Sequence, residues 1–354
     1  MDVEYVSSKE VLDLSPELQQ TVREILRKKC GTPSNPRLLG EESADPYALR
    51  RGAVIFQQRC AACHGATGDG AGPEADYMYP RPRDYRRGIF KFVSTPYGSK
   101  PRREDLMRTL QQGAKGTSMP SFALLPEEDL EAILDYVLVL THRGELETQL
   151  AIEAANEDEV SEEAVDDAVD LIKELWQEAE GAKVWPVTQM PPYSEESVEL
   201  GKKAFLTEEA GCFKCHGKDG TGKTSENSQG FKDIWGFQTR AADLTSGMFH
   251  GGNRPDDIYR RIYSGINGTP MPSFQMKLAE EPETFWNLVH YVQFISGARR
   301  REVVAQQLRY LPPQRTAKPS DEEPTDEEPT EDDAPPIADD TDATDADEPA
   351  DAEE

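Results

Sequence analysis

"RCAACHGATGDGAG", residues 59–72, places two cysteines and a histidine within five positions. A second stretch, "GCFKCHGKDGTGKT", residues 211–224, repeats this pattern further along the 354-residue chain. An offset of 152 residues superimposes the two motifs, with Cys60, Cys63 and His64 falling on Cys212, Cys215 and His216.

The repeat extends well beyond the cysteines. At the same offset, "EDLMRTLQQGAKGTSMPSF" (104–122) falls on "DDIYRRIYSGINGTPMPSF" (256–274), and each methionine follows its histidine by 55 residues. Between these anchors the register shifts, because "RDYRRGIFKF" (83–92) resembles "ADLTSGMFHG" (242–251) only at an offset of 159. The chain therefore carries two copies of one domain, with intervening loops that differ.

Each copy is predicted to begin and end with a helix. Asp45 and Ser194 are N-cap residues at the two starts, and Pro46 suits a first helical turn. Late in each copy, "PEEDLEAILDYVLVL" (126–140) and "PETFWNLVHYVQFI" (282–295) carry apolar residues at helical spacing. No stretch shows the strict alternation typical of a half-buried strand, so we expect an all-α fold.

Three kinds of chemistry compete for a Cys-x-x-Cys-His motif. A redox dithiol belongs at a helix start in a sheet-containing domain and has no use for the histidine. A structural zinc site could take four thiolates from the two pairs, but it leaves both histidines and the methionine motif unexplained. Covalent haem uses every residue: thiols one helical turn apart bond the porphyrin vinyl groups, and the next histidine lies under the iron. We therefore predict one covalently attached haem in each copy.

Met119 and Met271 are the expected sixth ligands of the two irons. An isolated methionine is most often a core filler, but both copies present it in a glycine-rich loop directly before a proline. Methionine–histidine ligation raises the reduction potential and fills both axial positions, which favours electron transfer over substrate binding. His142, His250 and His290 have no counterpart in the other copy and are not expected to bind iron; His142 is expected at a helix end.

The two copies resemble class I cytochrome c domains, and the chain is similar to bacterial dihaem c-type cytochromes. Cys-x-x-Cys-His-Gly and the late Met-Pro pair carry this resemblance, supported by Tyr136 and Tyr291 in the terminal helices. It implies first and last helices that cross near Gly52 and Gly201, around a nearly buried haem with an exposed edge. It also implies two haem c groups, with the irons held by the ligand pairs His64 with Met119 and His216 with Met271.

Five segments follow from these observations. An N-terminal helical extension is expected over 1–44, cytochrome c domains over 45–143 and 194–300, an acidic helical spacer over 144–193, and a disordered acidic tail over 301–354. Residues 316–354 carry 18 Asp and Glu against one Lys, with few large apolar side chains to bury.

Two helices are expected outside the repeat. The extension contains a helix capped by Ser15 and closed by Gly31, and its last residue, Cys30, is either buried or a free thiol. The spacer carries an apolar stripe that either packs on a neighbouring domain or docks a partner. The stripe consists of Val165, Val169, Ile172 and Trp176.

The charge and the motifs together set the expected function. A formal net charge of −28 disfavours nucleic acid and suits redox partners with a basic docking face. We expect a dihaem electron carrier, without enzymatic activity, that moves single electrons between partners of a respiratory chain. The alternatives are a cytochrome subunit of an oxidase or dehydrogenase complex, and a dihaem peroxidase, which needs one iron with an open position.

The resemblance implies that haem is attached on the outer side of the cytoplasmic membrane. We therefore expect the protein in the periplasm or facing it. No run of 18 apolar residues is present, and the first 20 residues do not form a secretory signal. We therefore expect that a signal or an N-terminal membrane anchor has been removed or lies upstream.

Overall fold

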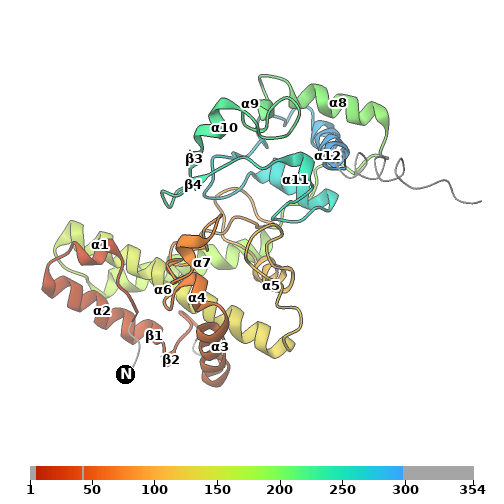
Figure 1. Cartoon of the computed structure of the whole chain (residues 1–354). Helices are drawn as coiled ribbons and strands as arrows, with labels where there is room; N and C mark the ends of the chain where they lie inside the picture. Colours follow the sequence, from red (N-terminus) through yellow and green to blue (C-terminus); the bar gives the residue numbers. More distant parts are fainter. Residues whose placement is uncertain (1–4, 42–43, 298–354) are drawn as a thin grey trace, which may run out of the picture. The chain divides into compact units, whose positions relative to one another are not determined.

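Helices dominate both copies in the computed structural model, which describes residues 5–41 and 44–297 (Figure 1). The first copy contains α3 (Pro46–Arg59), α4 (Ala61–His64), the 3-10 helix η1 (Ala75–Tyr77), α5 (Arg103–Gln112) and α6 (Glu127–Glu157). The second copy contains α8 (Glu195–Phe205), α9 (Cys212–His216), α10 (Ser225–Gln229), η2 (Leu244–Ser246), α11 (Pro255–Ser264) and α12 (Glu283–Ser296). The expected tail over 301–354 lies outside the described residues.

The strands among the described residues are short and form two antiparallel pairs. β1 (Gly31–Thr32) pairs with β2 (Asn35–Pro36), and β3 (Phe231–Lys232) pairs with β4 (Gln238–Thr239). Each strand is two residues long. The all-α prediction is therefore confirmed.

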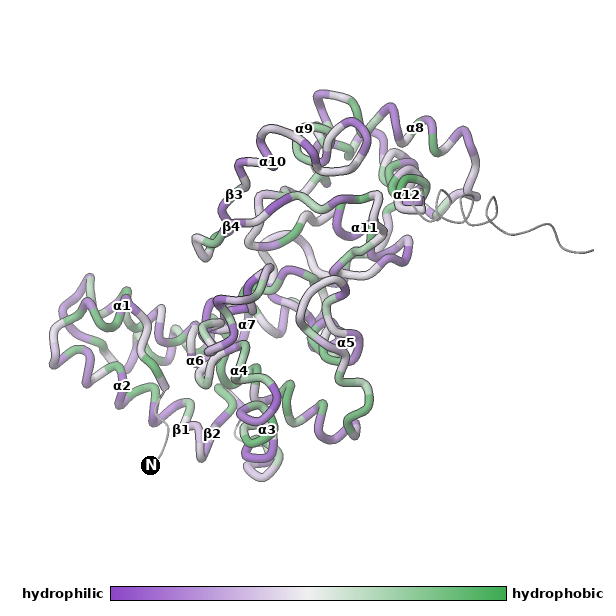
Figure 2. The backbone as a smooth tube through the Cα atoms, viewed as in Figure 1, coloured by the Kyte–Doolittle hydropathy of each residue, from purple (hydrophilic) through white to green (hydrophobic). Residues whose placement is uncertain are grey.

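The expected helix starts are also confirmed. The Asp45 carboxylate accepts a hydrogen bond from the backbone N–H of Tyr47 at 2.9 Å, and the Ser194 hydroxyl accepts one from Ser197 at 3.1 Å. These bonds satisfy donors that the first helical turn leaves free. α12 is largely apolar along its length (Figure 2), as a helix buried in a core must be.

The first and last helices of each copy cross at a glycine. A Cβ atom on Gly52 of α3 would lie 1.9 Å from the carbonyl oxygen of Ala132 of α6. A Cβ atom on Gly201 of α8 would lie 1.9 Å from the carbonyl oxygen of Asn287 of α12. The two backbones are in direct contact at these points, so no other residue fits. The predicted crossings are confirmed.

The rings that flank the crossings are matched as well. Phe56 packs edge-on against Tyr136 with ring centroids 5.4 Å apart, and Phe205 packs against Tyr291 at 5.3 Å. Both pairs meet at an interplanar angle of 61°. Such edge-to-face pairs stabilise a core beyond their buried area.

α6 runs without interruption past residue 143 to Glu157. The expected helix end at His142 is therefore wrong: this residue lies inside α6, is buried, and packs edge-on against Trp176 with ring centroids 4.9 Å apart. Burial lowers the pKa of its imidazole to about 3, so the ring is neutral and does not act as a cation at a helix terminus. The helix continues because a second core covers its distal half.

That second core joins the N-terminal extension to the spacer. α1 (Lys9–Leu12) and α2 (Pro16–Cys30) pack on the distal half of α6 together with α7 (Glu162–Gly181). Cys30 is a buried free thiol in this core, and the apolar stripe of α7 is turned inward. The packing alternative for the stripe therefore holds. The buried residues are Val11, Val22, Leu26, Cys30, Leu39, Leu146, Leu150, Ala151, Val165, Ala168, Val169 and Ile172.

The described residues of the two copies belong to one compact unit, and the copies meet through equivalent helices. Asp105 and Arg108 of α5 correspond, at the offset of 152, to Asp257 and Arg260 of α11. Arg108 pairs with Asp257 across the copies at 2.9 Å, and Arg260 lies 3.9 Å from the same carboxylate. The repeat thus brings complementary charges of its own pattern together. None of the helices described is long and apolar enough to cross a bilayer.

Candidate haem-binding sites

The two Cys-x-x-Cys-His motifs form single helical turns. In the first copy the N–H groups of Cys63 and His64 both donate to the carbonyl oxygen of Cys60, at 3.1 and 2.9 Å. In the second copy α9 begins at Cys212 and ends at His216. The two cysteines of each motif are free thiols one turn apart, which is the spacing that bonding to two vinyl groups requires.

The surroundings of these thiols do not suit a redox dithiol. Burial raises the pKa of Cys60 to about 12 and that of Cys212 to about 11. A dithiol nucleophile needs a lowered pKa, because the thiolate is the reactive form. Zinc is equally disfavoured, because no three His, Cys, Asp or Glu side chains of the described residues gather in a metal-binding cluster.

Each motif histidine is oriented by one backbone carbonyl. His64 Nδ1 lies 3.0 Å from the carbonyl oxygen of Arg83, and His216 Nδ1 lies 3.0 Å from that of Ala242. A carbonyl only accepts, so Nδ1 carries the proton in both rings and Nε2 keeps its lone pair. This arrangement fixes the tautomer that binds a metal through Nε2. The site fits an iron on the Nε2 side.

The loop after each histidine is held by the same backbone bonds. The N–H of Gly70 donates to His64 O at 2.9 Å, and that of Gly222 donates to His216 O at 2.7 Å. Further on, Tyr85 N–H donates to Gly68 O, and the equivalent Leu244 N–H donates to Gly220 O, both at 2.8 Å. The structure therefore places residues 83–92 and 242–251 at equivalent positions, as the offset of 159 predicts.

Those carbonyls are functional groups that motif reasoning did not identify. Arg83 and Ala242 have unrelated side chains, and only their backbone takes part. The available signal was the weak repeat at the shifted offset, which begins at these two residues. Tyr85 adds a further contact in the first copy, where its ring stacks on His64 with centroids 4.7 Å apart.

The methionine loops repeat one hydrogen-bond pattern. Thr117 Oγ1 accepts from the N–H of Met119 at 3.1 Å, and Met119 O accepts from the N–H of Ala114 at 3.2 Å. In the second copy the corresponding bonds run from Met271 N–H to Thr269 Oγ1 at 3.3 Å and from Ile266 N–H to Met271 O at 3.1 Å. These bonds fix the backbone on both sides of the thioether, so the repeated Gly-Thr-x-Met-Pro serves to present the methionine.

One glycine in each loop cannot be replaced without moving the methionine. Gly113 has φ +67 and Gly265 has φ +70, a conformation that side chains rarely adopt. A Cβ atom would lie 2.6 Å from Met119 O in the first copy and 2.7 Å from Met271 O in the second. The motif glycine thus serves the methionine loop in both copies.

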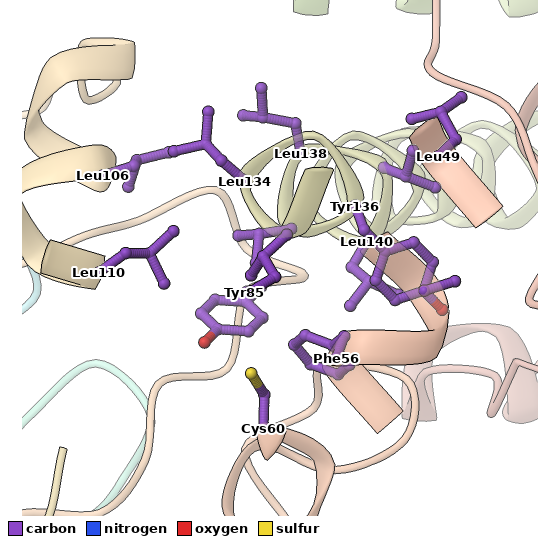
Figure 3. Close-up of a cluster of buried hydrophobic side chains, with 14 of the residues drawn as sticks. Leu49, Phe56, Cys60, Tyr85, Leu106, Leu110, Leu134, Tyr136, Leu138 and Leu140 are labelled. Carbon is purple, nitrogen blue, oxygen red and sulfur yellow. The ribbon is translucent and has the colours of Figure 1, made fainter. Parts of the chain in front are cut away.

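An apolar wall borders the cysteine side of each site, and in the first copy it also reaches the methionine. In the first copy Cys60 borders the same buried cluster as Phe56 and Tyr85 (Figure 3), with Met119 packed against that cluster. In the second copy Cys212 packs on the corresponding cluster around Phe205, Ile258 and Val292. A porphyrin is a large apolar disc, so such a wall fits it.

The remaining histidines have other partners. His290 Nδ1 forms a short, buried hydrogen bond with the Ser197 hydroxyl. His250 Nδ1 is hydrogen bonded to the carbonyl oxygen of Lys115, next to the methionine loop of the first copy. His142 lies in the core beside Trp176. The structure gives each of the three a local packing role.

Comparisons with known proteins agree with this geometry. Residues 48–137 match the family model for cytochrome C oxidase, cbb3-type, subunit III, and residues 198–296 match the model for cytochrome c. Among solved structures, the chain is similar to one from the reducing HAO-like protein complex of Kuenenia stuttgartiensis, at 32% identity and a TM-score of 0.54. The similarity covers 69% of this chain and 95% of that one. No curated protein sequence matches the chain.

Proposed function

Because the chain belongs to the dihaem c-type cytochromes, with one covalently bound haem in each cytochrome c domain, we propose that it passes single electrons within a larger redox assembly. The observation that carries this proposal is the duplicated site: both domains present an oriented histidine and a methionine held by the same bonds.

The duplicated ligand set supports transfer rather than turnover. The bound haem supplies a one-electron couple at its iron. His64 and His216 would hold the iron through Nε2, and Met119 and Met271 would supply a second ligand from loops held by four hydrogen bonds, two of them to threonine hydroxyls. A peroxidase needs one displaceable ligand, and neither methionine loop lacks its supporting bonds. We therefore propose an electron carrier that has no catalytic site of its own.

Membership of an assembly is supported by the solved neighbour. That neighbour is part of a reducing HAO-like protein complex, and this chain matches 95% of it. We infer that this chain likewise works beside a redox enzyme, as its electron-transferring subunit or tightly docked partner. A free carrier of a respiratory chain is the second candidate. We propose that the protein lies in the periplasm or faces it, which fits either role. Release of the protein by osmotic shock tests this location.

Exposed apolar side chains mark where a partner would dock. Leu124 is fully exposed, five residues after Met119, and Met276 is 84% exposed at the equivalent position after Met271. Single exposed apolar residues are ordinary, but a matched pair beside the two methionine loops gives each haem domain a contact point. The acidic chain would then steer a basic partner, more strongly at low salt.

The haem chemistry is tested first on the natively exported holoprotein. We expect a pyridine haemochrome count of two haems per chain, the weak far-red sulfur-to-iron band at both sites, and no peroxide turnover. One haem without that band, together with peroxide turnover, would replace the carrier by an enzyme.

The assembly is tested by sizing the untagged native protein at low and high salt. We expect it to elute with a multi-haem partner at low salt, and we expect Leu124→Glu or Met276→Glu to weaken that association. Ile152→Glu is the matched control, because Ile152 is also an exposed apolar residue but lies on the distal half of α6. Elution as a single 39.5 kDa chain under all conditions would favour the free carrier.

A further inference from the structure

The second copy has seven extra residues in the loop that follows its proximal histidine. The acceptor carbonyl lies 19 residues after His64 but 26 residues after His216. This difference accounts for the shift of the repeat from an offset of 152 to one of 159. The longer loop contains the hairpin β3–β4, hereafter the hairpin 231–239.

The tip of the hairpin is tightly built. Asp233 Oδ1 accepts from the N–H groups of Trp235 and Phe237, at 3.1 and 3.0 Å. Ile234 N–H donates to Gly268 O at 3.1 Å, which ties the tip to the methionine loop of its own domain. The indole of Trp235 is therefore presented from a fixed backbone.

Three cations of the first copy converge on this tip. The Arg83 guanidinium lies 3.7 Å from the centroid of the Trp235 ring, and Arg87 Nη1 donates to Ile234 O at 2.7 Å. Lys91 Nζ lies 3.7 Å from Asp233 Oδ2, with the two side chains 13% and 8% exposed. Because the Lys91 and Asp233 side chains are largely out of water, their attraction is weakly screened, whereas Arg87 is exposed.

The two partners of this contact are each confined to one copy. At the offset of 159, the second copy has no Arg or Lys at the three equivalent positions. They are occupied by Ala242, Ser246 and His250. The second copy has the long loop, and the first has the cations that receive it. The two domains are therefore complementary at this point rather than duplicated.

The contact falls on the residue that orients the first proximal histidine. The carbonyl oxygen of Arg83 accepts the hydrogen bond from His64 Nδ1–H, and its guanidinium packs on Trp235. Hydrogen bonding to the outer nitrogen of a metal-bound histidine fixes the ring and tunes the metal. Charge and burial near a haem also set its potential.

We propose that the hairpin 231–239 of the second domain sets the environment of the first haem, with Trp235 as a positioning residue for the Arg83–His64 hydrogen bond. Asp233 offsets part of the positive charge that Arg83 and Lys91 place on that side. A nearby positive charge favours the reduced iron, which carries one positive charge fewer. Two haems with the same ligand pair thereby acquire different potentials. This inference rests on the two haems and not on the partner of the chain.

The test uses the full-length holoprotein with Met271→His as the background. Replacing Met271 removes the far-red band of the second site, so that the remaining band reports on the first haem during a potentiometric titration. The variants compared are Asp233→Asn, Trp235→Leu, Trp235→Phe and Lys232→Met. A haemochrome count of two per chain is required for each variant, which separates this test from the question of partner and role.

The expected shifts have defined signs. Asp233→Asn keeps the Oδ1 acceptor but removes the negative charge, so the potential of the first haem rises. Trp235→Leu frees the guanidinium, so the potential falls and the His64 Nδ1 proton exchanges faster with solvent in NMR spectra. Trp235→Phe retains a ring under the guanidinium and stays close to the parent. Lys232→Met is the control, because Lys232 is an exposed cation of the same hairpin whose charge water screens.

Unchanged potentials in both Asp233→Asn and Trp235→Leu would overturn the proposal. So would a Lys232→Met shift as large as that of Asp233→Asn, since the effect would then be one of overall charge. If Trp235→Phe behaves like Trp235→Leu in both the potential and the proton exchange, Trp235 is not a positioning residue and the proposal fails.

Discussion

Adding one methyl group at the crossing of α3 and α6 should unfold the first haem domain at lower denaturant than the second. The Cβ of Gly52→Ala would lie 1.9 Å from Ala132 O and 3.2 Å from Tyr136 Cβ. Non-bonded heavy atoms pack best at about 3.5–4.0 Å, so the two helices must move apart. The atom in the way belongs to the backbone and is unable to rotate aside. Overpacking costs about 1–3 kcal/mol, and we expect the upper end of that range here.

The assay is a urea titration of the holoprotein followed at the far-red methionine band. With a slope of about 1–3 kcal/mol per molar urea, a loss of about 3 kcal/mol lowers the midpoint by about 1–3 M. In Gly52→Ala, the half of the band that belongs to the first site should be lost at a lower urea concentration than the other half. In Gly201→Ala, the half that belongs to the second site should be lost first. Gly181→Ala is the matched control: it lies at the end of α7 with no atom within 4 Å of a new Cβ, and we expect a gain of up to about 1 kcal/mol. A midpoint for Gly52→Ala equal to that of the control would refute the reasoning.

Three further predictions concern single side chains. Met119→His should lower the potential of the first haem and remove half of the far-red band, because methionine ligation raises the potential. Met271→His should do the same for the second haem. A far-red band that keeps its full intensity in both variants would contradict this. Since the pKa of His142 is lowered from 6.5 to about 3, only the unfolded chain takes up its proton below pH 6.5, and stability falls as the pH drops from there toward 3. His142→Leu should remove this pH dependence of stability, which amounts to about 2 kcal/mol between pH 6.5 and 5. If the urea midpoints of parent and variant change in parallel across this range, the prediction is wrong. Ser197→Ala leaves the buried His290 Nδ1 without its partner and should cost about 1–3 kcal/mol in urea unfolding, whereas an unchanged midpoint would mean that water replaces the hydroxyl.

The sequence predicted those parts of the fold that repeat. Two motifs at one offset, with glycines and aromatic rings at the helix crossings, leave little freedom in how each domain folds. The residues proposed to bind haem are predicted from local spacing for the same reason, because a helical turn fixes the geometry between Cys60 and His64. A motif of four or five consecutive residues keeps its local geometry even where the surrounding loops differ.

Two features depended on tertiary contacts and were missed for that reason. The end of α6 was expected near His142 because the cytochrome c pattern stops there, but α2 and α7 supply a second core that stabilises fourteen more residues, 144–157. The hairpin contact was missed because Trp235 and Arg83 lie in irregular loops 152 residues apart, where neither periodicity nor capping reports a neighbour. Only the seven-residue register shift pointed to that loop.

The unbroken helix α6 also matters for anyone who wishes to express the haem domains separately. Its first half belongs to the core around Phe56, and its second half belongs to the core around Cys30. A cut after residue 143 would divide one helix between two products and expose Leu146 and Leu150, which are buried in the intact chain. A better dissection point is the stretch without helix or strand between α7 and α8, residues 183–194, so that the first haem domain stays with the N-terminal extension and α7 as one fragment.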